Sequence, residues 1–144
     1  MRTQMTLLAA TLAFASIAFT NQANAATLTV KITGISEAVG KMAVKLVASQ
    51  EAYDGKVKAS AAQMLPVSST EPMTLTFPDL APGTYAVLVM QDENGNGTLD
   101  SNILGIPKEG YGFSNNPNVM RKPYFDETKF EVTAADKAIE IEIL

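Results

Sequence analysis

The sequence predicts an all-β fold, a single antiparallel β-sandwich of about seven strands, on three observations. Apolar and polar residues alternate with a period of two over several short segments, which is typical of strands with one buried face. Turn-forming residues separate these segments. The chain has 144 residues and no cysteine, so we expect one domain that is held by packing rather than by disulfides.

The N-terminal segment is predicted to be a signal peptide that lies outside the fold. Arg2 supplies a positive charge, residues 7–19 form an apolar run, and Ala23 and Ala25 are the small residues that a cleavage site needs. The apolar run is shorter than the roughly 20 residues that span a bilayer core. We therefore expect residues 1–25 to be removed and residues 26–144 to form an exported domain without a membrane span, in the periplasm or the extracellular medium.

The strands follow from the alternation in chain order. It predicts strands at residues 27–33, 41–46, 63–68, 73–77, 130–132 and 139–143, of which 63–68 has the weakest pattern. Residues 85–90 are apolar on both faces, which is typical of a central strand that is covered on both sides. A short helix is expected around residues 51–62, although Gly55 weakens it.

The composition limits the chemistry. Histidine and cysteine are both absent, so Ser-His and Cys-His catalytic pairs and Cys/His zinc sites are excluded. The chain has 11 basic residues against 15 acidic ones and no basic stripe, which makes it poorly suited to binding nucleic acid.

An oxygen-rich loop is expected directly after the strand at 85–90. It matches the first part of an EF-hand calcium loop, with Gly97 at the sharp turn. Where that motif ends in a bidentate glutamate this chain has Ile103, so Glu109 or water would have to complete the coordination. The Asn-Gly pairs equally predict a hairpin turn that needs no ion. The candidate calcium ligands are Asp92, Asn94, Asn96, Thr98 and Asp100.

A long segment rich in Gly, Pro and Asn follows at residues 103–124. Segments of this length without regular structure are often functional. Two aromatic residues lie in it beside amides and a carboxylate, a combination that suits binding of a sugar or a peptide. The alternative is that both aromatic side chains fold back and close one end of the sandwich. The candidate ligand-binding residues are Glu109, Tyr111, Phe113, Asn115 and Asn116.

Two motifs carry resemblances to known proteins. Phe77-x-x-Leu80-x-Pro82-Gly83-x-Tyr85 resembles the strand corner of transthyretin-like and carboxypeptidase-regulatory-like sandwiches, so a transthyretin-like or immunoglobulin-like sandwich is expected. The residues from Tyr85 to Asp100, followed by the stretch from Gly105 to Asn116, resemble the bacterial domain-of-unknown-function 2141 family, and the resemblance covers about residues 28–144. It implies a small exported bacterial protein with a β-sandwich fold, and no established activity or site residue.

Three functions are compatible with these residues. We expect a non-catalytic binding or structural module, stabilised by calcium if the loop holds an ion, whose partner is a small ligand, a glycan or a peptide. One alternative is a small glycosidase-type hydrolase, which would need two carboxylates from among Asp92, Asp100 and Glu109. The other is an assembly subunit that pairs through a sheet edge. Neither the ligand nor the oligomeric state follows from the sequence.

Overall fold

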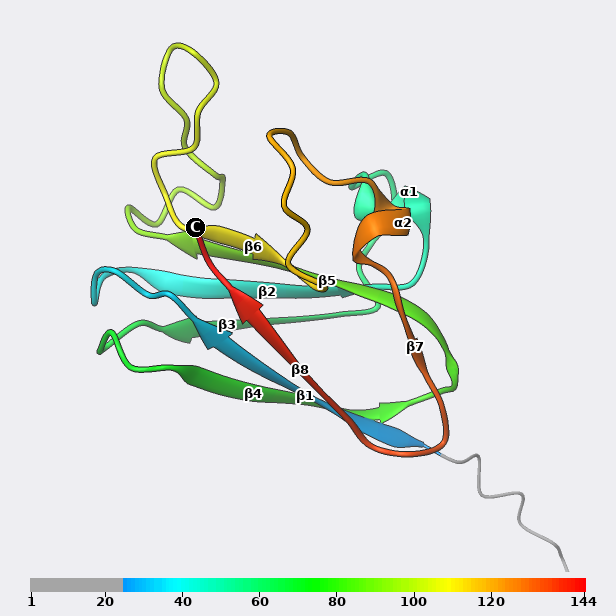
Figure 1. Ribbon diagram of the computed structural model, residues 1–144. Helices are drawn as coiled ribbons and strands as arrows, with labels where there is room; N and C mark the ends of the chain where they lie inside the picture. Colours follow the sequence, from blue (N-terminus) through cyan, green and yellow to red (C-terminus); the bar gives the residue numbers. More distant parts are fainter. Residues whose placement is uncertain (1–24) are drawn as a thin grey trace, which may run out of the picture.

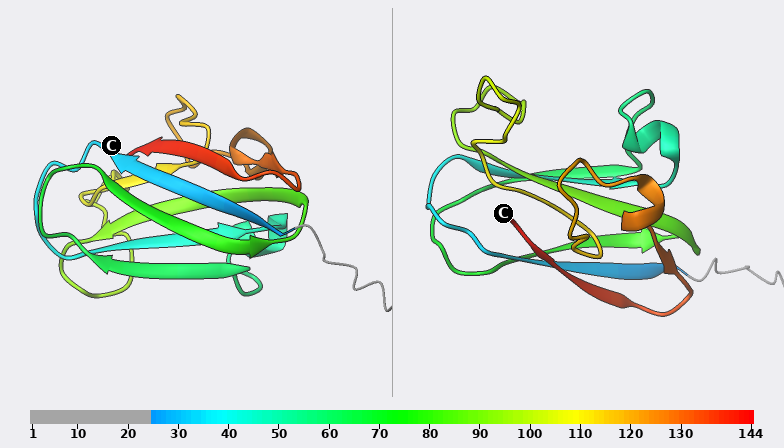
Figure 2. Two further views of the ribbon diagram at one scale, coloured as in Figure 1. Left: turned by 90° about the horizontal axis from the view of Figure 1, so that it is seen from below. Right: turned by 45° about the horizontal axis from the view of Figure 1, so that its top comes forward.

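Two β-sheets face each other across the core in the computed structural model, which describes residues 25–144 (Figure 1). Figure 2 shows the two layers from below and from a tilted view. The predicted all-β sandwich is thus confirmed, whereas the predicted signal peptide lies almost entirely outside the described residues. The elements in chain order are β1 (Ala26–Thr33), β2 (Lys41–Val47), α1 (Gln50–Tyr53), β3 (Ala61–Pro66), β4 (Met73–Leu80), β5 (Gly83–Asp92), β6 (Tyr111–Phe113), α2 (Phe125–Thr128), β7 (Phe130–Val132) and β8 (Lys137–Glu142).

The smaller sheet has the order β4-β1-β8 and contains a parallel pair. Strand β1 is antiparallel to β4 but parallel to β8, with Val30 beside Ile139 and Ile32 beside Ile141. The chain reaches β8 from β7, which pairs with β5 in the other sheet, and it therefore enters the smaller sheet in the same direction as β1. The alternation predicted each strand but could not predict this direction.

The larger sheet has the order β3-β2-β5-β6, and β7 also pairs with β5. The predicted alternation is reproduced in its core face, because every second residue of β2 points inward and is fully buried. The buried side chains of the two sheets meet in one hydrophobic core. Its fully buried members include Leu28, Val30, Ile32, Met42, Val44, Leu46, Val87 and Ile141.

The segment after β2 differs from its prediction. Helix α1 is a single turn, capped by the Ser49 hydroxyl, which accepts a hydrogen bond from the Ala52 amide. The chain leaves the helix at Gly55, which adopts a φ of +75°. Residues 61–66 then form β3 instead of extending the helix.

Both helices pack on the outer face of the larger sheet, the face turned away from the core (Figure 1). Tyr53 of α1 and Phe125 of α2 form a second hydrophobic cluster there with Val47 and Ala86. Their ring centroids are 5.8 Å apart. The helices thus cover only the part of the outer face where β2 ends and β5 begins, as the positions of Val47 and Ala86 indicate. Within residues 25–144, no helix is long and apolar enough to cross a membrane.

Candidate functional site: a groove on the outer face of the larger sheet

The uncovered part of the outer face is the floor of a groove. Strand pairing aligns two rows of outward side chains across β2, β5 and β6. One row is Ala43, Met90 and Tyr111, and the other is Lys45, Leu88 and Phe113. Leu88, Met90, Tyr111 and Phe113 are only half-buried, although each is large and apolar or aromatic. The strand that was predicted to be covered on both sides is therefore only partly covered on its outer face, where Leu88 still packs against the cluster beneath the helices.

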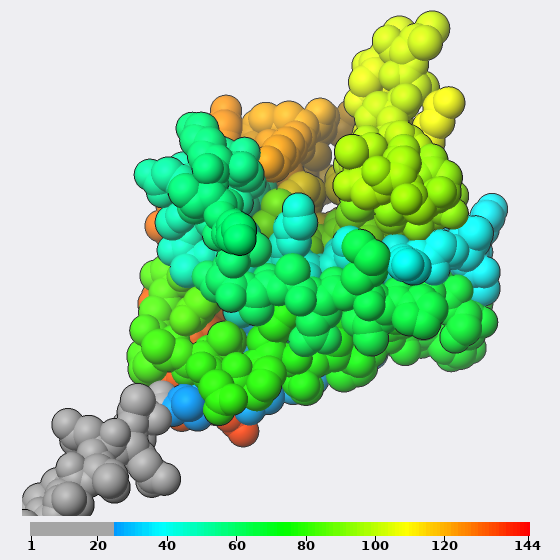
Figure 3. All heavy atoms as spheres, turned by 180° about the vertical axis from the view of Figure 1, so that it is seen from behind, coloured from blue at the N-terminus to red at the C-terminus, as the bar shows by residue number. Residues whose placement is uncertain are grey.

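Two loops form the walls of this outer groove, which has a volume of about 980 Å³. The loop of residues 92–109 forms the first wall, of which residues 97–107 line the groove, and residues 118–122 form the second wall. Figure 3 shows the loop of the first wall standing away from the helices, with a hollow between them. The walls carry exposed apolar side chains, since Leu104 is 78% exposed and Ile106 is 56% exposed. Ile103 and Met120, at the loop tips, are fully exposed.

The first wall is held by hydrogen bonds of its own. Each carboxylate oxygen of Asp92 accepts a backbone N–H, from Gly95 and from Gly97, both at 2.8 Å. The side-chain amides of Asn94 and Asn96 both donate to the Asp100 carboxylate. The predicted oxygen-rich turn is therefore present as a closed loop.

Glu109 ties the two ends of this loop together. Its side chain is buried, with 5% exposed. One carboxylate oxygen accepts the Glu93 N–H at 3.0 Å and the other accepts the Asp100 N–H at 2.9 Å. Charge-assisted bonds of this kind are the stronger ones in proteins. Glu109 was predicted to bind a ligand or an ion, but in this structure it acts as a clamp at the base of the first wall.

The five candidate calcium ligands lie in the first wall, where their oxygens are within one loop. Asp92 and Asp100 are its two carboxylates, and Asn94, Asn96 and Thr98 alternate between them. Each carboxylate oxygen of Asp92 accepts only one hydrogen bond and keeps a lone pair, so the donor chemistry suits a hard cation. Within residues 25–144, however, three or more acidic side chains do not gather as a metal-binding group. Calcium binding therefore stays a prediction.

The second wall is fastened to α2 by an ion pair. The Arg121 guanidinium contacts both carboxylate oxygens of Glu127, at 2.8 and 3.0 Å. The Tyr124 N–H also donates to this carboxylate at 2.7 Å. The hydrogen bond from Arg121, and then that from Tyr124, lower the pKa of Glu127 from 4.5 to about 2.

This shift predicts how stability changes with pH. Because the pKa of Glu127 is lower in the folded state than in the unfolded state, its contribution is present above pH 4.5 and is lost as the pH falls toward about 2. We expect the Glu127→Gln variant to lose less stability than the parent between pH 5 and pH 2 in urea unfolding. Equal losses in the two proteins would contradict this assignment.

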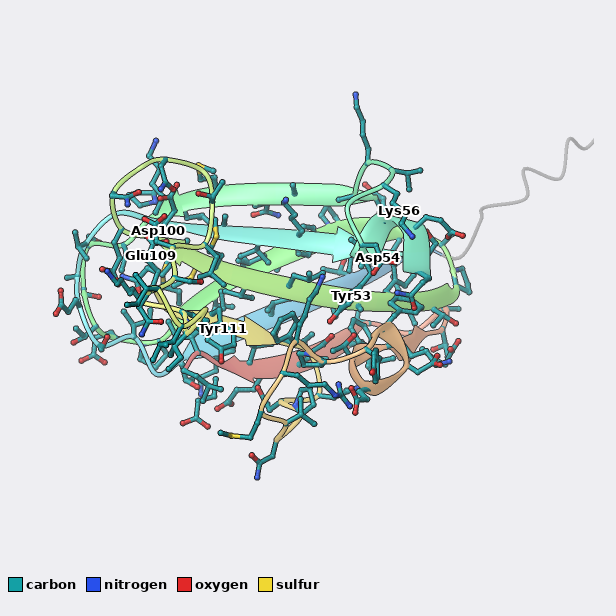
Figure 4. The ribbon with its side chains drawn as sticks, turned by 90° about the horizontal axis from the view of Figure 1, so that it is seen from above. Tyr53, Asp54, Lys56, Asp100, Glu109 and Tyr111 are labelled. Carbon is teal, nitrogen blue, oxygen red and sulfur yellow. The ribbon has the colours of Figure 1, made fainter. Side chains whose placement is uncertain are left out.

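Of the candidate ligand-binding residues, the structure brings Tyr111 and Phe113 into the groove. They do not close an end of the sandwich, which corrects that alternative. Gly112 between them faces the core, where a Cβ would lie 2.8 Å from Ile141 Cγ2, so both aromatic side chains point outward. Figure 4 shows Tyr111, Glu109 and Asp100 toward one end of this face and Tyr53 toward the other.

Asn115 and Asn116 hold the chain after β6 in place. Both have a positive φ, which asparagine tolerates better than most residues. The Asn115 amide donates to the carbonyls of Glu127 and Lys129. The Asn116 amide donates to the Glu140 carbonyl at 3.0 Å, and its oxygen accepts the Glu142 N–H at 2.9 Å. Asn116 thus pairs with the outer edge of β8 as a neighbouring strand would.

Sequence reasoning missed the floor residues Leu88, Met90 and Lys45. The apolar run at residues 85–90 pointed to part of the floor, because Leu88 and Met90 belong to it. An apolar strand needs protein or a ligand over both faces, and no segment of the sequence was predicted to cover the outer one. Lys45 gave no local signal. It joins the groove only through its register opposite Leu88.

Comparisons with known proteins identify a family but no activity. Nothing among the curated proteins matches the chain. A solved structure, a pilus-presented adhesin, is similar at 14% identity with a TM-score of 0.31. The match covers 82% of this chain but only 26% of the adhesin chain. The family described as "Uncharacterized protein conserved in bacteria (DUF2141)" matches residues 30–140. The chain therefore belongs to this bacterial family, as the stretch from Tyr85 to Asn116 had suggested.

Proposed function

We propose that this protein is a non-catalytic binding module whose ligand lies in the outer groove. The observation that carries the proposal is the uncovered floor, where Leu88, Met90 and Tyr111 form an apolar surface between two walls. Concave, mostly apolar sites with a few polar groups are the usual form of small-molecule sites. The signal peptide predicted at residues 1–25 favours export, so we place the module in the periplasm or the extracellular medium.

The positions of the carboxylates support binding over hydrolysis. A glycosidase needs two carboxyl groups that face the substrate from opposite sides. The described lining of the outer groove contains no Asp or Glu side chain. Asp92 and Glu109 instead accept backbone N–H groups inside the first wall.

The bonding at the edge of β8 argues against assembly by addition of a strand to this edge. Its Glu140 carbonyl and Glu142 N–H already bond to the Asn116 side chain. A strand that added to this edge would have to displace the asparagine and replace both bonds.

A charged side chain on the groove floor is expected to weaken binding of an apolar probe. We expect the parent protein to bind a neutral, apolar naphthylamine dye with enhanced fluorescence, and Leu88→Glu to weaken this binding at least about tenfold, because a carboxylate would enter the apolar floor. The control is Thr74→Glu, an exposed position on β4 in the other sheet. Equal dye binding by the parent and both variants, or none by the folded parent, would remove the groove as the binding site.

We further propose that calcium stabilises the first wall, with Asp92, Asn94, Asn96, Thr98 and Asp100 as the oxygen ligands. Each oxygen of Glu109, like those of Asp92, accepts one backbone N–H and keeps a lone pair, so Glu109 or water would complete the coordination. A cation at 100 times its Kd that binds only the folded state should stabilise it by about 2.7 kcal/mol.

Thermal melts in EDTA and in millimolar calcium test this proposal. We expect calcium to raise the melting temperature of the parent by several degrees. The melting temperature of the Asp100→Asn variant should be the same with calcium and with EDTA. Asp100→Asn is preferable to a change at Asp92, because the Asp92 carboxylate also caps two backbone amides. The absence of a shift in the parent would leave the loop as a hairpin turn.

A further inference from the structure

The groove has an apolar part and a cationic end. Lys45 lines both the outer groove and a shallow adjoining pocket of about 410 Å³. Lys56 and Lys58 also line this pocket, beside α1, and the Lys56 ammonium is paired with the Asp54 carboxylate at 3.4 Å. In Figure 4, Lys56 lies toward the end of the face opposite Tyr111. An elongated ligand on this face would therefore meet apolar side chains along one part and ammonium groups at one end.

The charge of this surface differs from that of the whole chain. The sequence carries a net charge of −4, yet the charged side chains that line the described groove are Lys45, Arg121 and Lys122. Arg121 is paired with Glu127, and the Lys122 ammonium lies 4.5 Å from the Tyr53 ring centroid. Within residues 25–144, no carboxylate lies within ion-pairing distance of Lys45. Lys45 is thus a cation on the groove floor whose charge is not neutralised by the described protein.

We propose that the ligand of the outer groove is an anionic amphiphile, a molecule with an acyl chain and a carboxylate. The acyl chain lies along Leu88, Met90 and Tyr111, and the carboxylate binds the Lys45 ammonium. Lys58 adds positive potential, whereas Lys56 is paired with Asp54. This inference rests on the proposed function and specifies the class of ligand.

Two other ligand classes fit the floor less well. A sugar needs several side-chain donors and acceptors, whereas on the floor Leu88 and Phe113 offer none and Tyr111 offers one hydroxyl. The uncharged polar side chains of the groove, Thr98, Ser101 and Asn118, lie in its walls. A peptide that adds as a strand needs free backbone groups along an edge. The floor is instead the face of paired strands, whose backbone groups already bond within the sheet. An acyl chain requires only apolar contact.

The test uses three molecules with the same tail and different head groups: dodecanoate, dodecanol and dodecyltrimethylammonium. Each is titrated against the protein below its aggregation concentration, by displacement of the naphthylamine dye. We expect dodecanoate to bind most tightly and Lys45→Ala to weaken it about three- to fivefold, to the affinity of dodecanol, because an ion pair with an exposed lysine is lost. The matched control is Lys41→Ala, on the same strand and face but outside the groove lining, which should change nothing.

The outcomes separate this inference from the proposed function. Equal affinities for the three molecules, unchanged in Lys45→Ala, would keep the groove as a binding site and overturn the anionic class. A folded parent that binds neither the dye nor any of the three molecules would overturn both. Binding of dodecanoate that survives both Leu88→Glu and Lys45→Ala would place the amphiphile elsewhere and overturn the inference. Circular dichroism of each variant confirms that it is folded.

Discussion

Replacing Glu109 with alanine is expected to lower the free energy of unfolding by about 3 kcal/mol, because two charge-assisted hydrogen bonds are lost and their donors stay partly buried. The Glu109 carboxylate joins the Glu93 N–H to the Asp100 N–H and so closes the base of the first wall. Water would replace these bonds only poorly, since the side chain is just 5% exposed. Urea unfolding of the parent and the variant measures the difference.

Two further variants distinguish a clamp from an ordinary surface carboxylate. Glu71→Ala changes an exposed glutamate and should alter stability by no more than about 0.5 kcal/mol. Glu109→Gln keeps one acceptor oxygen and should fall between the parent and Glu109→Ala. If Glu109→Ala lowered the free energy of unfolding no more than Glu71→Ala does, the Glu109 clamp would not stabilise the fold. The Asp and Asn side chains of the first wall would then hold it alone.

Gly40→Ala is expected to have an effect of similar size for a steric reason. Gly40 has a φ of +70°, and a Cβ there would lie 2.1 Å from the Asp92 carbonyl oxygen and 2.6 Å from Glu93 Cα. Both atoms belong to the backbone, so neither can rotate away. The left-handed conformation costs an alanine about 1 kcal/mol, and displacing the start of the first wall adds about 1–3 kcal/mol. Urea unfolding again measures the change.

Gly55→Ala is the matched control for this substitution. Gly55 has a φ of +75°, but a Cβ added there meets nothing within 4 Å. Its replacement therefore carries the conformational cost without the steric one, and we expect a loss of about 1 kcal/mol. Equal losses in the two variants would show that the backbone at Asp92 moves aside freely.

The sequence predicts the sandwich well because burial on one face leaves a local pattern. The alternation located β1, β2, β4, β7 and β8 without any knowledge of their partners. It missed β6, whose three residues are too few to alternate and include Gly112. A glycine is needed at position 112 because its backbone lies against Ile141 and Glu142. These residues are distant in the sequence, and only the fold brings them near.

The candidate site was harder to predict because it depends on pairing between distant strands. Tyr111 and Phe113 were identified by residue type, and the groove indeed includes them. Glu109 was identified for the same reason, but its oxygens face backbone amides, a partnership that composition does not reveal. Lys45 and Leu88 belong together only through the register of β2 with β5.

The central place of β1 in the smaller sheet has a consequence for how the chain folds. Both of its partners come later in the sequence, and the Thr27 N–H bonds to Asp136, 109 residues away. Closing a loop of that length costs on the order of 4 kcal/mol of chain entropy. We expect folding on the millisecond-to-second scale that non-local β-proteins show. During synthesis β1 emerges early, and the backbone N–H and C=O groups on its β8 edge stay unpaired until residues 137–142 follow.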